Sequence, residues 1–433
     1  MDRFMKLTPA WRAGTIGIAV AVVALVVVVV ASAGSNAPHK AIPTASIATT
    51  STNAVTPVSK ASSPKHAAHK HGKGSGKAAG TANGSTNGST NGSSGGSGKT
   101  AGGSSSKSSG GSNCSTGATS GSGQLVMYGN APEPQFKPVL TAFAKAYPNI
   151  NISYQDIDDN VAFSKYRAEH AQGARTADIL MASSPLQWDN NKDVALCWTP
   201  SDASSYPSYL QQFPGILIAS PDPAVSIYSK AKLPANLIPS TFAQLVSDLK
   251  SHPDLFKGKI STYSVDNQFG YSAFWGLVHE HGWAWLDALA HASKPQADGT
   301  AMAEQIASGA SNYGFFESGL VRGAITSGTV AQIAGWTFMH DFTPLIPRGI
   351  AITKGASNPG AAKVFVNWMF STAGQEAMCA AGFTAYKSGV SCTNSLSSIQ
   401  QAVGSSNVYL VPFHSSIAAD HAAFVQRWHS LFG

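Results

Sequence analysis

The chain has 433 residues, and only 12% of them are charged. Its formal net charge of +7 is unevenly spread. Residues 1–33 carry +2 and residues 34–122 carry eight lysines and no acidic residue, which leaves −3 for residues 123–433. Because the part able to fold has no basic surplus to neutralise phosphates, the composition argues against a nucleic-acid-binding protein. Four cysteines in this length also exclude a disulfide-dense scaffold.

The first 33 residues are typical of an export signal. Residues 13–33 form a run of 21 residues without a charge, and about 20 apolar residues span a membrane as a helix. The positive residues before this run predict that the short N-terminal end stays inside and the long remainder lies outside. The small residues at 31–33 match a signal-peptidase site, whereas the length of the run favours a retained anchor. Both alternatives predict export of the bulk of the chain.

Residues 34–122 are predicted to form a disordered linker. They consist mostly of Ser, Gly, Ala, Thr, Asn, Lys and Pro, with the tandem NGSTNGSTNGSS at 83–94. Such a composition cannot bury enough apolar surface to offset the entropy of an ordered chain. The sequence HAAHKH at 66–71 can be a weak metal site, but a cationic linker is the simpler interpretation. The segment suits a tether for a folded module.

From residue 123 onward the sequence alternates between short apolar strands and amphipathic helices. The predicted elements are, in chain order, a strand at 125–128, a helix at 134–147, a strand at 151–154, a helix at 161–173, strands at 179–182 and 224–228, a helix at 240–250 capped by Thr241, a strand at 259–265, a helix at 271–281, a strand at 330–334, and helices at 358–369 and 415–431. This alternation favours an α/β fold with parallel strands and helices on both faces. Since residues 123–433 are many for a single core, we expect two lobes.

Polar and aromatic residues follow several of the predicted strands. In open α/β sheets, ligands bind beyond the carboxyl ends of the strands. At residues 183 and 184 two hydroxyls precede a helix start, where free N–H groups point. The candidate ligand-binding residues are Tyr128, Asn130, Ser183, Ser184, Asn267, Gln268 and Tyr271, with Trp336 as a side chain that can stack on a ligand.

Several of these features have a structural alternative. A serine before a helix can be an N-cap, and a tryptophan more often belongs to the core. Asp156, Asp158 and Asp159 form an acidic cluster that we interpret as the approach to a helix, with calcium binding as the alternative. Residues 123–433 contain no GxSxG motif, the sequence has no P-loop, and His279 and His281 lack the spacing of a zinc protease. We therefore expect no enzyme activity, no cofactor and no resident metal.

The cysteines fall into two groups. Cys379 and Cys392 flank a helix end and its loop, and an exported chain permits a disulfide between them. Cys197 is interpreted as a buried thiol. Cys114, within the predicted linker, is interpreted as a free or intermolecular cysteine.

Three stretches resemble extracellular solute-binding proteins of ABC importers. They are LVMYGNAPEPQFKPVLTAFAKAYPNINISY at 125–154, AEHAQGARTADILMASSPLQW at 168–188 and PRGIAITKGASNPGAAKVFVNWMFSTAGQEAM at 347–378. The last stretch is similar to the family's return strand, helix and Ser-x-x-Gly-Gln turn. The nearest subgroup resembles the type II binders that include receptors for ferric iron, thiamine and aminoethylphosphonate.

The resemblance implies a two-lobed type II periplasmic-binding-protein fold that closes on one ligand. Lobe 1 is expected at about 123–228 plus 336–392, and lobe 2 at about 229–335 plus the C-terminal helix. Hinge strands are expected at 224–229 and within 330–352. Ferric binders of the subgroup use adjacent tyrosines, whereas the sequence QFGYSAFW contains Tyr271 alone. The resemblance therefore favours an organic or oxyanion solute, held by uncharged donors, over ferric iron.

Taken together, these features predict an exported solute receptor that works as a monomer and delivers its solute to an ABC permease. It is expected on the outer face of the cytoplasmic membrane, in the cell wall or in the periplasm, with residues 13–33 as its anchor. The alternatives are a stalked adhesin or co-receptor, a ferric-iron binder, and an exported enzyme on the same scaffold.

Overall fold

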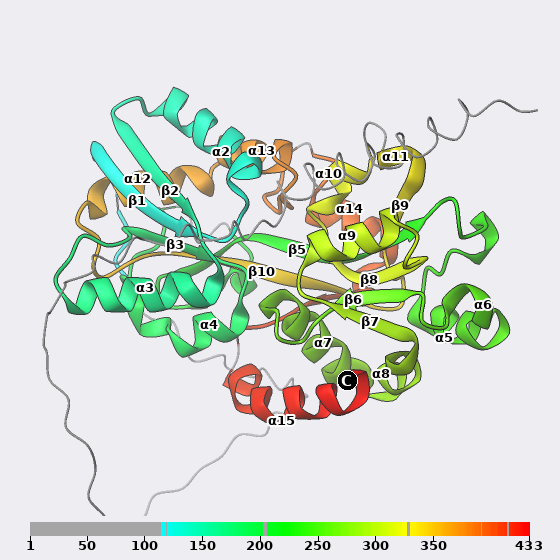
Figure 1. The fold of residues 1–433 in the computed structure, drawn as a ribbon. Helices are drawn as coiled ribbons and strands as arrows, with labels where there is room; N and C mark the ends of the chain where they lie inside the picture. The colour runs from blue at the N-terminus through cyan, green and yellow to red at the C-terminus, as the bar shows by residue number, and fades with distance from the viewer. Residues whose placement is uncertain (1–113, 118, 202–205, 327–329, 391, 414) are drawn as a thin grey trace, which may run out of the picture. The chain divides into compact units, whose positions relative to one another are not determined.

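The computed structural model describes residues 114–433 except 118, 202–205, 327–329, 391 and 414 (Figure 1). The export segment at 1–33, most of the predicted linker and its histidines at 66–71 lie outside the described residues. In the part of the chain that the structure describes, no helix is both long and apolar enough to cross a membrane.

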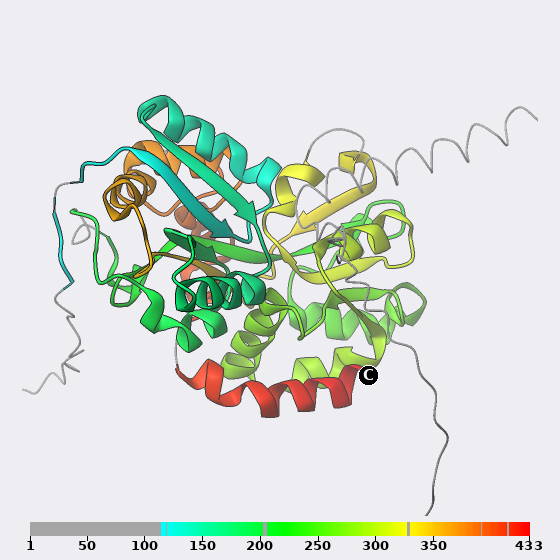
Figure 2. The ribbon, with the colours of Figure 1, turned by 60° about the vertical axis from the view of Figure 1, so that its left-hand side comes forward.

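The first lobe is built on three parallel strands. The central strand is β1 (Gly123–Gly129), which pairs with β2 (Ile150–Asp156) on one side and with β3 (Ile179–Ala182) on the other. Figures 1 and 2 show helices on both faces of these strands. One face is covered by α2 (Glu133–Ala146), α12 (Pro359–Met369) and α13 (Thr372–Ala380), and the other by α3 (Asp159–Ala171) and α4 (Pro185–Asn190).

The second lobe repeats this arrangement. Strand β6 (Ile260–Tyr263) lies between β7 (Ser293–Gln296) and β8 (Tyr313–Ser318), and all three are parallel. The helices of this lobe are α5 (Phe242–Ser251), α6 (Pro253–Phe256), α7 (Gln268–His281), α8 (Ala284–Leu289), α9 (Gly299–Ala307), α10 (Val321–Ile325) and α11 (Val330–Ile333). The C-terminal helix α15 (Ser415–Phe432) packs against α7 and also against α4 of the first lobe.

Two antiparallel strands, β5 (Ile216–Ser229) and β10 (Thr343–Ile352), connect the lobes. The first half of β5 pairs with β10, which pairs in turn with β3. The second half of β5 pairs with β8 and with β9 (Ala334–Thr337). The described strands thus follow the order β2-β1-β3-β10-β5-β8-β6-β7, with β4 (Gln211–Phe213) and β9 added to β5, and β11 (Val408–Leu410) to β10. The two-lobed α/β fold is therefore confirmed.

The start of several helices follows from their first residues. The Thr241 hydroxyl accepts a hydrogen bond from the Gln244 N–H at 2.9 Å, as the sequence predicts for the cap of α5. The Asn358 side chain caps α12, and Pro359 occupies its first turn, where the missing N–H costs nothing.

Two strand predictions differ from the structure. Strand β5 starts at Ile216 rather than 224, because Pro221 and Pro223 in its first half lack the N–H of a ladder hydrogen bond and so hide the strand in the sequence. The predicted strand at 330–334 is wrong, since residues 330–333 form α11. Strand β9 begins only at Ala334, where the chain reaches its pairing partner in β5.

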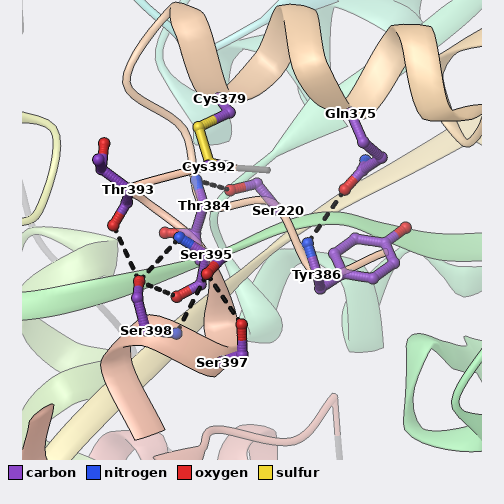
Figure 3. Close-up of a disulfide and its surroundings, with 10 residues drawn as sticks. All are labelled: Ser220, Gln375, Cys379, Thr384, Tyr386, Cys392, Thr393, Ser395, Ser397 and Ser398. Atoms are coloured by element: carbon purple, nitrogen blue, oxygen red, sulfur yellow. Dashed lines mark hydrogen bonds between the residues drawn. A yellow bond between two sulfur atoms is a disulfide. The ribbon is translucent and has the colours of Figure 1, made fainter. Parts of the chain in front are cut away.

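A disulfide joins Cys379, near the end of α13, to Cys392 in the loop before α14 (Leu396–Val403) (Figure 3). The enclosed loop is fastened to β5, because the Thr384 N–H donates to the Ser220 hydroxyl at 3.0 Å. It is also fastened to α13, because the Tyr386 N–H donates to Gln375 Oε1 at 3.2 Å. The loop therefore lies against one of the two strands that connect the lobes.

The interpretation of Cys114 and Cys197 is wrong, because the structure joins them in a second disulfide. Residues beside the bond pair as well: the Ser115 N–H donates to the Cys197 carbonyl at 3.2 Å, and the Thr199 N–H donates to the Ser115 carbonyl at 3.1 Å. The pairing of cysteines far apart in sequence cannot be deduced from spacing alone. The disulfide thus ties Cys114, which lies within the predicted linker, to the first lobe.

Candidate functional site

A cavity of about 150 Å³ lies at the carboxyl ends of strands from both lobes. Its lining includes the residues at or just after the ends of β1, β2, β3, β6 and β8, which is where open α/β sheets bind ligands. The lining residues are Asn130, Pro132, Asp156, Ile157, Asp158, Asp159, Ser183, Tyr263, Asn267, Gln268, Phe269, Asp298, Gly299, Ser318, Leu320 and Arg348. This volume is smaller than the roughly 300–1,000 Å³ of sites for drug-sized ligands, so the cavity fits a small solute.

On the first lobe a chain of polar side chains reaches from the cavity to the connecting strands. The Asn130 amide donates to Asp159 Oδ2 at 3.0 Å, and its oxygen accepts a hydrogen bond from Arg348. Arg348 Nε donates to Asp222 Oδ2 at 3.0 Å, and this ion pair is almost completely buried. The register of β10 against β5 shifts at Arg348, and such a bulge redirects a side chain out of the regular pattern. The bulge thus places Arg348 between the cavity and β5.

Two buried polar atoms at the cavity have no hydrogen-bond partner among the described residues. They are Asp159 Oδ1 and Ser183 Oγ, and their residues are only 5% and 3% exposed. Leaving a buried polar group unsatisfied costs about 1–3 kcal/mol, and more for a charged one. A bound solute that supplies the missing partners would remove this cost.

Burial also changes the titration of the carboxylates here. It raises the pKa of Asp156 to about 6, and it raises the pKa of Asp159 to about 7 against the opposing charge of Arg348. Just behind the lining, burial raises the pKa of Glu317 to about 8. The charged form of a carboxylate is disfavoured wherever water is excluded. The cavity therefore holds carboxylates that change charge near neutral pH.

The second lobe contributes aromatic rings and helix caps. The rings of Tyr263 and Phe269 lie 5.4 Å apart at the cavity. Asn267 caps α7 by accepting from the N–H groups of Phe269 and Gly270, at 2.9 and 3.4 Å. Gln268 accepts a hydrogen bond from the Ser184 hydroxyl of the first lobe at 3.1 Å. This bond joins the two sides of the cavity directly.

The structure brings together part of the predicted residue set. Asn130, Ser183, Asn267 and Gln268 line the cavity, and Ser184 contacts Gln268 from its position as the cap of α4. The other three predicted residues, Tyr128, Tyr271 and Trp336, lie outside the lining.

Each of these three has a partner elsewhere. The Tyr128 hydroxyl donates to Glu169 at 2.7 Å and accepts from Lys165 at 2.8 Å. The buried Tyr271 hydroxyl donates to the Ile417 carbonyl of α15 at 2.6 Å. The Trp336 ring lies 5.6 Å from the Arg322 guanidinium. Their structural roles are therefore clear without a solute.

Residues that the sequence analysis did not select also line the cavity. Asp159 belonged to the acidic cluster interpreted as a helix approach, and Asp158 does cap α3 through the Asn160 N–H at 2.9 Å. Arg348 is the single charge in the otherwise uncharged strand TPLIPRGIAI, which was the available signal. The expected uncharged donors are thus accompanied by charged ones. Among the described residues, no three His, Cys, Asp or Glu side chains are grouped to hold a metal ion.

Gly129, the last residue of β1, lies against the ring of Tyr154. A Cβ atom at this position would lie 2.9 Å from the Tyr154 hydroxyl, which donates to the Ala131 carbonyl at 2.5 Å. Glycine at the end of β1 therefore lets the Tyr154 ring close the turn that leads to Asn130.

The family model for bacterial extracellular solute-binding proteins matches residues 130–376, more than half of the chain. The chain belongs to this family. It is thus a solute-binding protein of the ABC-transporter type, in a family of binding proteins whose members are exported. No protein in the curated set matches the sequence significantly.

Solved structures of solute-binding proteins share the fold. The substrate-binding protein of an ABC transporter from Agrobacterium tumefaciens is 22% identical, with a TM-score of 0.65 over 72% of this chain and 95% of that one. The Trichodesmium protein IdiA (FutA), in complex with iron and citrate, is 18% identical, with a TM-score of 0.57 over 71% and 99%. Iron-bound HitA from Pseudomonas aeruginosa is 15% identical, with a TM-score of 0.57 over 70% and 99%. At these identities the likeness concerns the fold alone.

Replacing Glu317 with glutamine is expected to make this solute-binding protein less sensitive to alkaline pH. Between the ordinary pKa of glutamate and the value of about 8 in the folded state, the folded chain binds a proton that the unfolded chain lacks. Folding stability is therefore lost as pH rises through this window, and Glu317→Gln removes that loss. Urea unfolding at pH 5 and pH 8.5 measures the free energy of unfolding of both proteins. The difference between the variant and wild type should be more favourable to the variant at pH 8.5 than at pH 5, by at least about 1 kcal/mol. An equal difference at both pH values would contradict the expectation.

Proposed function

We propose that this solute-binding protein captures one small solute in the cavity between its lobes and passes it to an ABC permease. The observation that carries the proposal is the cavity itself, which is lined by strand ends of both lobes and contains two buried polar atoms without partners. The residues proposed to contact the solute are Asn130, Asp159, Ser183, Tyr263, Gln268 and Phe269. Solute capture in such a site requires no catalytic group.

The lobes are proposed to close about β5 and β10, as in the type II subgroup. Support comes from the topology, since these two strands form the sheet connection between the lobes. A solute that contacts both sides binds the closed form more strongly and so shifts the population toward it. The Ser184–Gln268 hydrogen bond is a contact that closure is expected to preserve.

We further propose that residues 13–33 anchor the protein and that residues 34–113 tether the receptor, which works as a monomer at the outer face of the membrane or in the cell wall or periplasm. The length of the apolar run and the composition of the following segment support this arrangement. A stalked adhesin would share these two features but would not need the cavity.

The test combines solute identification with scattering. The full chain is purified in detergent, the small molecules that co-purify are identified by mass spectrometry, and their rebinding to the stripped protein is measured by calorimetry. Small-angle scattering should show contraction on rebinding. Absence of any rebinding solute, together with unchanged scattering across a library of small metabolites, would contradict the proposal.

Two variants connect binding with the cavity. The double variant Ser183→Ala/Gln268→Ala is expected to weaken rebinding at least about tenfold, because it removes one unsatisfied hydroxyl and the amide that spans the lobes. Ser251→Ala, an exposed change on α5, is the matched control and should bind like wild type. Equal affinities for all three proteins would place the solute elsewhere.

A further inference from the structure

We infer that the solute carries a positively charged nitrogen and that the carboxylate of Asp159 is its counter-ion. The inference rests on the proposed function, since it assigns a chemical class to the solute of the same cavity. It follows from the charges that line the cavity, from the partners these charges already have, and from the rings of the second lobe.

The lining has an excess of negative charge. Four aspartates line the cavity, and Arg348 is the single Lys or Arg among the described lining residues. The charge of Arg348 is already neutralised by Asp222 at 3.0 Å, with side chains only 4% and 1% exposed. An anionic solute would therefore be repelled by the ionised carboxylates of the lining, whereas a cationic solute would be attracted to them.

Three of the four aspartates have structural partners. Asp158 caps α3 and Asp298 caps α9, with Asp298 Oδ1 accepting from the Ala301 N–H at 2.8 Å. Asp156 accepts from the Glu133 N–H at 3.3 Å. Asp159 is held as well, by Asn130 at Oδ2 and by the Ser183 N–H, which lowers the pKa of this carboxyl, but it differs in that its Oδ1 is buried without a hydrogen-bond partner. An N–H or N⁺–CH group of the solute can supply the missing contact.

The surroundings of Asp159 suit an organic cation in particular. Ser183 Oγ, also buried without a partner, lines the same cavity and can accept from an ammonium group. Tyr263 and Phe269 line the cavity from the second lobe, and aromatic faces attract organic cations. A carboxylate and aromatic rings around one small cavity together favour a charged amine or quaternary ammonium.

The proposed counter-ion titrates near neutral pH, so binding should depend on pH. Burial is the largest cause of the raised pKa of Asp159, which is about 7. Two charged neighbours also act on this carboxyl: Asp158, in the preceding turn, raises its pKa, and Arg348, on β10, lowers it. Below this pH Asp159 is neutral and attracts a cation less. Between pH 8 and pH 6 the ionised fraction falls about tenfold, and the affinity should fall by a similar factor.

The test uses ligand pairs that differ only in charge. Calorimetry on the full chain in detergent compares choline with 3,3-dimethylbutanol, its uncharged isostere, at pH 8 and pH 6. Putrescine and ethanolamine extend the cationic set, and inorganic phosphate, glucose and ferric citrate represent the other classes. Choline keeps its charge at every pH, so a change in its affinity reports on the protein.

The variant Asp159→Asn keeps the shape and removes the charge, and Asp254→Asn on the exposed first turn of α6 is the matched control. We expect at least one cationic probe to bind, with affinity reduced at least about tenfold by Asp159→Asn and unchanged by Asp254→Asn. The pH dependence should become clearly weaker in Asp159→Asn, where Asp156 and Glu317 are the remaining groups that titrate between pH 6 and pH 8. Circular dichroism melting at pH 8 should show this variant folded and no less stable than wild type, since it removes a buried charge.

Other results separate the inference from the proposed function. Binding of phosphate, glucose or ferric citrate without any cation overturns the inference and leaves solute capture standing, as does full affinity for a cation in Asp159→Asn. If no probe binds, the solute that co-purifies decides: an amine or ammonium compound supports the inference, and a neutral or anionic compound overturns it. If nothing binds and nothing co-purifies, the proposed function fails as well.

Discussion

Replacing Arg348 with methionine is expected to lower the free energy of unfolding by about 3–5 kcal/mol. The change leaves Asp222, which is 1% exposed, as an unpaired charge inside the strands that connect the lobes. The Ser220 hydroxyl donates to Asp222 at 2.5 Å but cannot neutralise its charge. Since Ser220 also accepts from the Thr384 N–H, the loss should extend to the loop closed by Cys379–Cys392. Urea unfolding at pH 7 measures the effect.

Two further variants test this cause. Arg348→Met combined with Asp222→Leu removes both charges, and much of the lost stability should return, because a buried ion pair is often replaceable by apolar side chains. Arg427→Met is the control, since Arg427 is about half exposed and lies 3.8 Å from Asp287, and it should cost less than about 1 kcal/mol. A small effect of Arg348→Met alone would mean that water reaches Asp222.

Replacing Cys114 and Cys197 with serine is expected to cost about 4.5 kcal/mol of stability, if the bond acts by restricting the unfolded chain. The bond joins residues 83 positions apart, and the restriction grows with the length of the closed loop. The same change at Cys379 and Cys392, only 13 positions apart, should cost about 3 kcal/mol. Guanidinium unfolding of both double variants without reductant gives the comparison. A larger loss for the shorter loop would show that local contacts outweigh chain entropy.

The fold could be predicted from the sequence because the signals for its helices and strands are local. Apolar spacing and helix caps such as Thr241 mark where elements begin and end, and strand–helix alternation indicates parallel α/β lobes. The elements that it missed depend on distant partners. Strand β5 contains two prolines and is held by β10, more than one hundred residues away. The Cys114–Cys197 bond likewise depends on where the fold brings two segments together.

Part of the candidate site could be predicted because it also depends on local signals in the sequence. Asn130 and Ser183 follow β1 and β3 directly, Asn267 and Gln268 lie in the turn and helix start after β6, and the position of a strand end is a local property. Tyr128 and Tyr271 were selected by the same rule, but their hydroxyl groups bond within the protein. Arg348 was not predicted as a site residue, because its position depends on a bulge in β10 and on a buried partner in β5. A single charge within an otherwise apolar strand is the sequence signal that indicates such a residue.

The disulfide at Cys114 also determines where mechanical load enters the receptor. A pull on the chain ahead of Cys114 reaches Cys197 through the sulfur bridge as well as β1 through the backbone, so the central strand of the first lobe does not carry the force alone. Cys197 lies beside Trp198, which is buried in the core of the lobe that contains β1. If the N-terminal segment tethers the receptor as proposed, a force along it would act on the lobe that contains β1.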